Sequence, residues 1–216
     1  MHKTINNLIS IQNELKSSSE KYTPPRIIAV SKTFSITNIL PLIDYGHLHF
    51  GENKVQEALD KWSDLKAKNN DIKLHMIGKL QTNKVKHVIP LFDYIHSLDN
   101  LKLAEKIASE QKKINKNLKI FIQINIGNET QKSGIEPSNL ENLYNKCVNE
   151  LKLNIIGLMC IPPQINVETH FVNMQKINNQ LNLKELSMGM SADYLVAKNY
   201  GSTFVRLGSK IFGNRT

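Results

Sequence analysis

Short apolar runs alternate with amphipathic segments along nearly the whole chain. The runs at residues 26–31 (RIIAVS) and 119–126 (KIFIQINI) are continuous and apolar, which is typical of strands buried on both faces. Between such runs, apolar residues recur at helical spacing, as at residues 36–43. Pro41 stands inside that segment, so it must lie in the first helical turn or kink the helix. The pattern therefore predicts a repeating order of strand and helix.

Eight strands are expected, at residues 26–31, 47–50, 74–77, 94–98, 119–126, 154–160, 185–188 and 203–207. One helix is expected before them, and others near residues 36–43, 55–66, 83–91, 101–114, 138–151, 171–181 and 191–200. Strict alternation implies a parallel sheet. Eight repeats predict closure into an α/β fold, a (β/α)₈ barrel of the TIM type with an extra N-terminal helix. The alternative is a doubly wound open sheet, which would want a glycine-rich first turn that residues 31–34 (SKTF) do not supply.

Length and composition place the chain among globular proteins. It has 216 residues, of which 40% are hydrophobic and 22% charged, so one domain over residues 1–216 is expected. A chain of this size needs no disulfide or metal to fold. Its apolar runs are far shorter than the ~20 residues of a membrane span. Residues 1–21 lack the apolar core of a signal peptide. We therefore expect a cytoplasmic protein with no membrane partner.

The net charge of +9 could indicate a polyanionic partner, but its distribution argues against one. There is no basic block and no interleaved aromatic ladder, so no nucleic-acid partner is expected. Lysine dominates, with 25 lysines against three arginines. The scarce arginines are therefore informative, because a planar guanidinium fork has no substitute in lysine. Cys147 and Cys160 form no CxxC pattern, and Cys147 belongs to a helical apolar stripe.

Chemistry in such a barrel is expected at the carboxyl ends of the strands. Lys32 directly follows the first strand, where poor solvation favours a neutral amine. A neutral amine is the nucleophile that forms a Schiff base with an aldehyde. The alternative is a surface lysine, which describes most of the other lysines.

The last two loops have the character of a phosphate site. Gly189 and Ser191 are expected to open a helix, whose N-terminal N–H groups favour an anion. Gly208 and Ser209 follow the eighth strand, and the loops after strands seven and eight commonly hold phosphate in barrels. Arg206 projects near the same mouth. The simpler alternatives are N-capping by Ser191, turn formation by Gly208 and a rim salt bridge for Arg206.

A metal site, as in a metal-dependent barrel hydrolase, is the other possibility. His47 and His49 form an HxH pair on one face of the second predicted strand, and His75 and His96 could add ligands. No acidic ligand is placed with them, so no metal is expected. A P-loop segment is absent from the sequence.

Several strings resemble the pyridoxal phosphate homeostasis protein family (the YggS/PROSC family). They begin with residues 29–33 (AVSKT), 50–57 (FGENKVQE) and 75–84 (HMIGKLQTNK). They continue with residues 123–125 (QIN), 132–134 (KSG), 157–159 (GLM), 187–191 (SMGMS) and 205–213 (VRLGSKIFG). Each string alone is modest evidence for the family, but the whole set in this order along the chain is specific to it.

The resemblance implies the barrel of the alanine racemase N-terminal domain with pyridoxal 5′-phosphate as cofactor. Lys32 would hold the cofactor as an aldimine, and Asn53 would line its ring. Arg206 would face the pyridine nitrogen, and the phosphate would lie around Ser191, Gly208 and Ser209. Two positions depart from the family. Ser209 replaces the usual Thr and keeps the hydroxyl, and Lys54 replaces the usual Tyr, so a contact between that Tyr and the cofactor ring is not expected here.

The resemblance favours a non-enzymatic protein of intracellular cofactor homeostasis, a buffer or carrier that passes the cofactor to apo-enzymes. An arginine at the ring nitrogen disfavours its protonation and weakens the ring as an electron sink. The alternative is a racemase-like enzyme. Relatives with that activity carry a further β-domain, and the expected barrel leaves only residues 213–216 after it. Without such a domain, a monomer is the simpler expectation.

Overall fold

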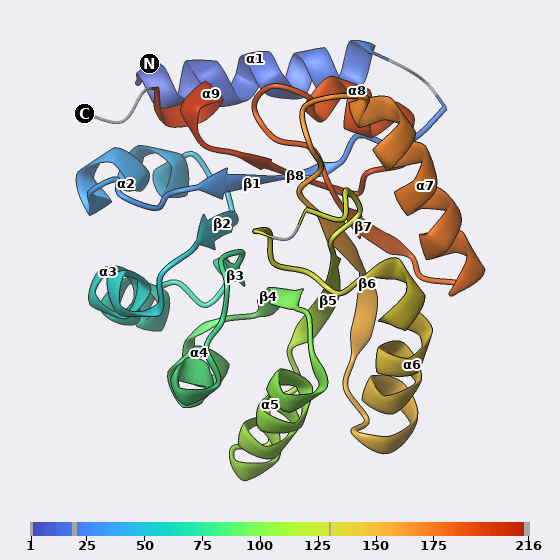
Figure 1. Ribbon diagram of the computed structural model, residues 1–216. Coiled ribbons are helices and arrows are strands. Elements are labelled where there is room, and N and C mark those ends of the chain that lie inside the picture. The colour runs from blue at the N-terminus through green and yellow to red at the C-terminus, as the bar shows by residue number, and fades with distance from the viewer. Residues whose placement is uncertain (1, 19–20, 130, 214–216) are drawn as a thin grey trace.

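The computed structural model describes residues 2–18, 21–129 and 131–213, and in it eight parallel strands close into a barrel in chain order. The strands are β1 (Arg26–Val30), β2 (His49–Glu52), β3 (Lys73–Met76), β4 (Tyr94–Leu98), β5 (Lys119–Ile124), β6 (Ile155–Cys160), β7 (Glu185–Ser187) and β8 (Phe204–Leu207). β1 pairs with both β2 and β8, which closes the sheet. The expected barrel is therefore confirmed and the open sheet is excluded (Figure 1).

Helices surround the barrel and follow the strands. They are α2 (Ile36–Asp44), α3 (Val55–Lys68), α4 (Val85–Leu91), α5 (Leu101–Lys113), α6 (Leu140–Asn145), α7 (Val167–Gln180), α8 (Tyr194–Asn199) and α9 (Ser209–Phe212). Two 3₁₀ turns, η1 (Thr82–Lys84) and η2 (Pro137–Asn139), and a π-helical segment, η3 (Lys146–Glu150), complete them. Within the described ranges, no helix combines the length and apolarity that crossing a bilayer requires.

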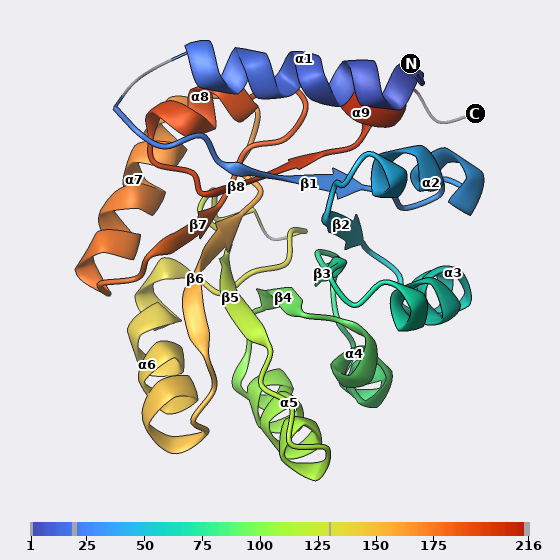
Figure 2. The ribbon, with the colours of Figure 1, turned by 180° about the vertical axis from the view of Figure 1, so that it is seen from behind.

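The N-terminal helix α1 (Lys3–Ser17) lies across α8 and α9 on one side of the barrel (Figures 1 and 2). Its apolar face is buried, with Leu8 and Leu15 almost fully covered. The buried Lys198 of α8 donates to the carbonyl of Leu15 near the carboxyl end of α1. A cation at that end complements the helix dipole. The extra helix is thus an integral part of the fold.

Two sequence expectations need correction, and one open alternative is decided. β2 runs from His49 to Glu52 instead of residues 47–50, because the amide of His47 is used to close the turn after α2 on Leu42. Of the two alternatives for Pro41, the first turn is excluded, because Pro41 lies in the middle of α2. The helix expected over residues 138–151 is divided into η2, α6 and η3.

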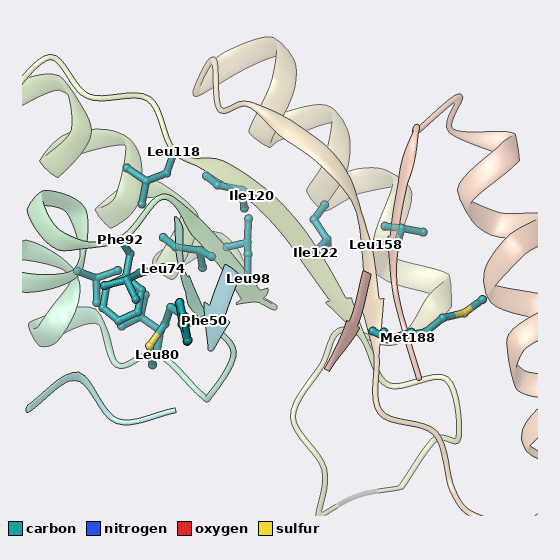
Figure 3. Packing of buried hydrophobic residues seen from close by; sticks show 14 of the residues in the cluster. Phe50, Leu74, Leu80, Phe92, Leu98, Leu118, Ile120, Ile122, Leu158 and Met188 are labelled. Atoms are coloured by element: carbon teal, nitrogen blue, oxygen red, sulfur yellow. The ribbon is translucent and has the colours of Figure 1, made fainter. Parts of the chain in front are cut away.

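The core has two layers, which explains why the strands are apolar on both faces. The outer layer lies between strands and helices and includes Phe50, Leu74 and Phe92 (Figure 3). The inner layer fills the barrel with Ile28, Tyr94, Phe121, Met159 and Phe204. Burying one such side chain contributes about 1.5–3 kcal/mol. The inner layer also holds buried polar side chains, among them His75 and His96.

Candidate functional site

A cavity of 760 Å³ opens where the carboxyl ends of the strands meet the following loops. All six site residues expected from the sequence line it: Lys32, Asn53, Ser191, Arg206, Gly208 and Ser209. The barrel brings them together because parallel strands end at the same edge. The structure therefore places the whole expected set in one cavity.

Lys32 is half-buried, and the backbone on both sides of it is tied to α3. The hydroxyl of Ser31 donates to Glu52 Oε1 at 2.7 Å, and the carbonyl of Ser31 accepts from Lys61 Nζ at 2.9 Å. On the other side, the N–H of Thr33 donates to Glu57 Oε1 at 2.5 Å. Thr33 has a φ of 69°, a left-handed conformation that a non-glycine residue rarely adopts. The position of Lys32 is thus held from two directions.

Glu52, Glu57 and Lys61 form a connected group that we call the clamp. Lys61 Nζ lies 3.0 Å from Glu52 Oε1 and 3.0 Å from Glu57 Oε1. The indole of Trp62 donates to the same Glu52 oxygen at 2.9 Å. The strand predicted over residues 47–50 would place Glu52 beyond its end. Glu52 instead ends the strand, faces α3 and is fully buried, because strand side chains alternate between the two faces.

Arg206 is a buried cation, only 4% exposed. Its Nη1 donates to the carbonyl and the hydroxyl of Ser187, each at 2.7 Å, and its Nη2 donates to the carbonyl of Cys160 at 2.7 Å. Burial lowers the pKa of the guanidinium from its ordinary value. Across the described residues, no carboxylate lies within ion-pair distance of it. The guanidinium is therefore held by neutral acceptors and retains donors for a ligand in the cavity.

The expected phosphate loops are present, but their local structure differs from the prediction. Ser209 begins α9 and Gly208 precedes it. Ser191, however, does not open a helix, because residues 191–193 form a turn and α8 begins at Tyr194. Asp193 takes the N-cap position, and its carboxylate accepts the N–H of Met190 at 2.6 Å. Ser191 thus lines the cavity from a turn.

Asn53 supplies an unsatisfied acceptor at the cavity. Its Oδ1 is buried and has no hydrogen-bond partner in the described part of the chain. Buried polar atoms are normally paired, so an unpaired one beside a cavity indicates a place for a ligand donor. Gly78 packs against this residue, since a Cβ at Gly78 would lie 2.3 Å from the carbonyl oxygen of Asn53. Only glycine allows the two loops to approach so closely.

Further cavity residues were not assigned a role from the sequence. Gln123 points inward near the end of β5, and its Nε2 donates to the carbonyl of Ser133 at 3.0 Å. Lys132 and Ser133 reach the cavity from the loop after β5. A glutamine inside the apolar run of residues 119–126 was the available signal for Gln123. Lys132 and Ser133 belong to the family-like string at residues 132–134 (KSG), but that string predicted no role for them, because their position depends on how the loop folds back.

The histidines do not form the predicted HxH pair. His47 precedes β2, and its Nε2 lies 2.9 Å from the carbonyl oxygen of His49. His49 Nδ1 instead lies 2.9 Å from His75 Nε2 inside the barrel. Throughout the described ranges, no three His, Cys, Asp or Glu side chains are grouped as metal ligands.

Comparison with known proteins places this barrel among characterised relatives. The family model described as "Alanine racemase, N-terminal domain" matches residues 7–216. The pyridoxal phosphate homeostasis protein of Aquifex aeolicus is 37% identical over 88% of this chain and 87% of its own length. That of Escherichia coli (strain K12) is 33% identical over 100% of this chain and 98% of its own.

Solved structures show the same fold. PipY of Synechococcus elongatus, determined with PLP bound, superposes with a TM-score of 0.86 at 31% identity, over 97% of this chain and 100% of PipY. An alanine racemase of Clostridium difficile superposes with a TM-score of 0.75 at 14% identity, over 97% of this chain and 57% of the racemase. The racemase shares the barrel and has a longer chain.

Proposed function

The chain belongs to the family of pyridoxal phosphate homeostasis proteins, whose barrel is that of the alanine racemase N-terminal domain, and we propose that it binds pyridoxal 5′-phosphate in the strand-end cavity. We propose that it acts in the cytoplasm as a buffer or carrier of this cofactor, without catalytic turnover. The observation that carries the proposal is the convergence of Lys32, Arg206 and the two serines Ser191 and Ser209 on one cavity.

The residues present fit this group. When bound, pyridoxal phosphate supplies an aldehyde that reacts with a primary amine, together with an aromatic ring and a phosphate dianion. Lys32 offers the amine, on a backbone held by the clamp. Ser191 and Ser209 offer hydroxyl donors for the anion, and the amides at the start of α9 lie beside them. Asn53 lines the same cavity beside them.

Arg206 favours a protein that binds the cofactor over an enzyme that uses the cofactor to transform an amino acid. A guanidinium kept at the ring nitrogen disfavours protonation of that nitrogen, since two cations would meet. An unprotonated ring withdraws electrons weakly from a carbanion. The bonds from Arg206 to Ser187 and Cys160 hold the guanidinium in one orientation at the cavity.

Absorption spectroscopy tests the proposal directly. The purified protein, incubated with pyridoxal phosphate and desalted, is expected to keep a cofactor absorption band. Lys32→Ala is expected to lose that band while its circular dichroism stays native, and Lys86→Ala, at an exposed lysine of α4, is expected to keep it. An unchanged band in Lys32→Ala would contradict the role of Lys32. No retained band in the parent protein would contradict cofactor binding itself.

Racemase activity is the second candidate, because the barrel is shared with alanine racemase. The loaded protein is expected to leave L-alanine unchanged in a chiral assay. Robust racemisation would refute the proposal of a non-enzymatic protein. Two further parts of the proposal are equally testable: a monomer is expected by light scattering, and apo-forms of cofactor-dependent enzymes are expected to gain activity when mixed with the loaded protein.

A further inference from the structure

A line of hydrogen bonds crosses the barrel interior from β2 to β8. His49 Nδ1 lies 2.9 Å from His75 Nε2, and His75 Nδ1 lies 2.9 Å from His96 Nε2. His96 Nδ1 lies 3.0 Å from Ser187 Oγ, which accepts a hydrogen bond from Arg206 Nη1 at 2.7 Å. We call His49, His75 and His96 the histidine row. It leads directly to the arginine of the cavity.

The rings of the row are packed firmly in place. His75 and His96 have no exposed surface. His75 stacks on Tyr94 with ring centroids 4.1 Å apart, and His96 stacks on Phe121 with centroids 4.3 Å apart. The rings therefore have little freedom to turn away from one another.

The direction of the hydrogen bonds follows from Arg206. A guanidinium can only donate, so Ser187 Oγ must accept from it. Apart from Arg206, the hydrogen-bond partner of this hydroxyl among the described residues is His96 Nδ1. Ser187 is fully buried and a buried donor is normally paired, so its hydroxyl hydrogen goes to His96 Nδ1, which leaves the proton of that neutral ring on Nε2.

The position of the proton on His96 then fixes the donor direction at His75 and His49. His96 Nε2–H donates to His75 Nδ1, so His75 carries its proton on Nε2 and donates to His49 Nδ1. This requires neutral rings. Burial lowers the pKa of His75 and His96 well below the ordinary value, and the charge of Arg206 adds to the effect at His96. Burial also lowers the pKa of His49 to about 4. Each ring then has one N–H, pointing away from Arg206.

We propose that the histidine row is a positioning device for Arg206. With every N–H directed away from the arginine, the row turns its acceptor end toward a buried cation that has no carboxylate partner among the described residues. Aligned acceptors stabilise a buried charge that no carboxylate contacts directly, and the more distant carboxylate of Asp193 adds to this effect. Through Ser187 the row keeps the guanidinium charged and in one orientation. Its consequence for the cofactor rests on the function proposed above, whereas the direction of the row does not.

Nitrogen NMR of the ligand-free protein tests the direction alone. With ¹⁵N-labelled histidine at neutral pH, long-range ¹H–¹⁵N spectra are expected to show the Nε2–H tautomer for all three rings. Ser187→Ala removes the hydroxyl donor and keeps the backbone carbonyl, so it is expected to change the tautomer of His96. An Nδ1–H or charged His96 in the parent protein, or an unchanged tautomer in Ser187→Ala, would overturn the proposal.

Cofactor binding tests the effect on Arg206. Ser187→Ala is expected to weaken the affinity for pyridoxal phosphate about tenfold, the loss that follows removal of one charge-assisted hydrogen bond. It is also expected to shift the absorption maximum of the bound cofactor. Ser97→Ala is the matched control, because Ser97 is a buried strand serine whose Oγ has no partner in the described chain. Equal affinities and spectra for the two variants would refute the positioning role. If the parent protein binds no cofactor, the function proposed above fails, and the tautomers still decide the direction of the row.

Discussion

Replacing Lys61 with methionine would test the clamp that holds the backbone of Lys32. The change keeps an unbranched apolar stem and removes the ammonium group. Three hydrogen bonds are lost, to the carbonyl of Ser31 and to the carboxylates of Glu52 and Glu57. Glu52 is the costly partner, because it is fully buried and the side chain of Lys61 is only 9% exposed.

Removing one partner of such a buried pair leaves an uncompensated charge, which costs about 3–5 kcal/mol. That is a large part of the ~5–15 kcal/mol that stabilises a typical domain. Glu52 Oε2 has no hydrogen-bond partner in the described residues, and without Lys61 the carboxylate keeps only the neutral donors Ser31 and Trp62 at Oε1. Lys61→Met is therefore expected to be among the more destabilising single substitutions in the chain.

Urea unfolding at pH 7 measures this effect. Lys61→Met is expected to lose about 3–5 kcal/mol, whereas Lys68→Met, at an exposed lysine of the same helix, should stay within about 0.5 kcal/mol of the parent. Adding Glu52→Gln to Lys61→Met removes the uncompensated charge and is expected to recover part of the loss. A loss below about 1 kcal/mol for Lys61→Met, or strictly additive losses in the double variant, would refute the reasoning.

The remaining predictions concern the cavity wall, the histidines and the thiols. Gly78→Ala is expected to lower the unfolding free energy because its Cβ would meet the main chain of Asn53 at 2.3 Å, whereas Gly208→Ala should fold normally with its nearest contact at 3.5 Å. Equal urea unfolding midpoints for the two variants would contradict this. The pKa of His49 falls to about 4 in the folded state. Between about pH 4 and pH 6.5, the unfolded chain therefore binds a proton at His49 that the folded chain does not bind. The unfolding free energy should then fall as the pH drops from about 6.5 toward 4, by up to about 1.4 kcal/mol per pH unit for each such proton, and constant stability across that window would oppose the assignment. Burial raises the pKa of the Cys147 and Cys160 thiols to about 11 and about 12. Both should resist a thiol reagent at pH 8 until the protein unfolds, and fast reaction of the native protein would count against their burial.

Much of the fold and the site followed from local pattern. Alternating apolar runs and helical stripes predicted eight strand–helix units, and the structure closes them into a barrel. In a parallel barrel every strand ends at the same edge, so position along the chain was enough to bring Lys32 and Arg206 to one cavity. The resemblance of the motifs then identified a cofactor that comparison supports for the family.

The sequence by itself therefore determined the architecture and six residues of the cavity, because strand and helix periodicity and the family-like strings are all contained in short segments. Only the tertiary structure decided how those residues are held. His96 and Ser187 are 91 positions apart, and their contact depends on the register and tilt of strands on different sides of the barrel. Glu52 lies beyond the strand predicted over residues 47–50, but β2 extends through it. Strand alternation then directs its side chain to α3, where it is the centre of the clamp. Local pattern carries no information on such inter-element register, which is set by how the whole sheet closes.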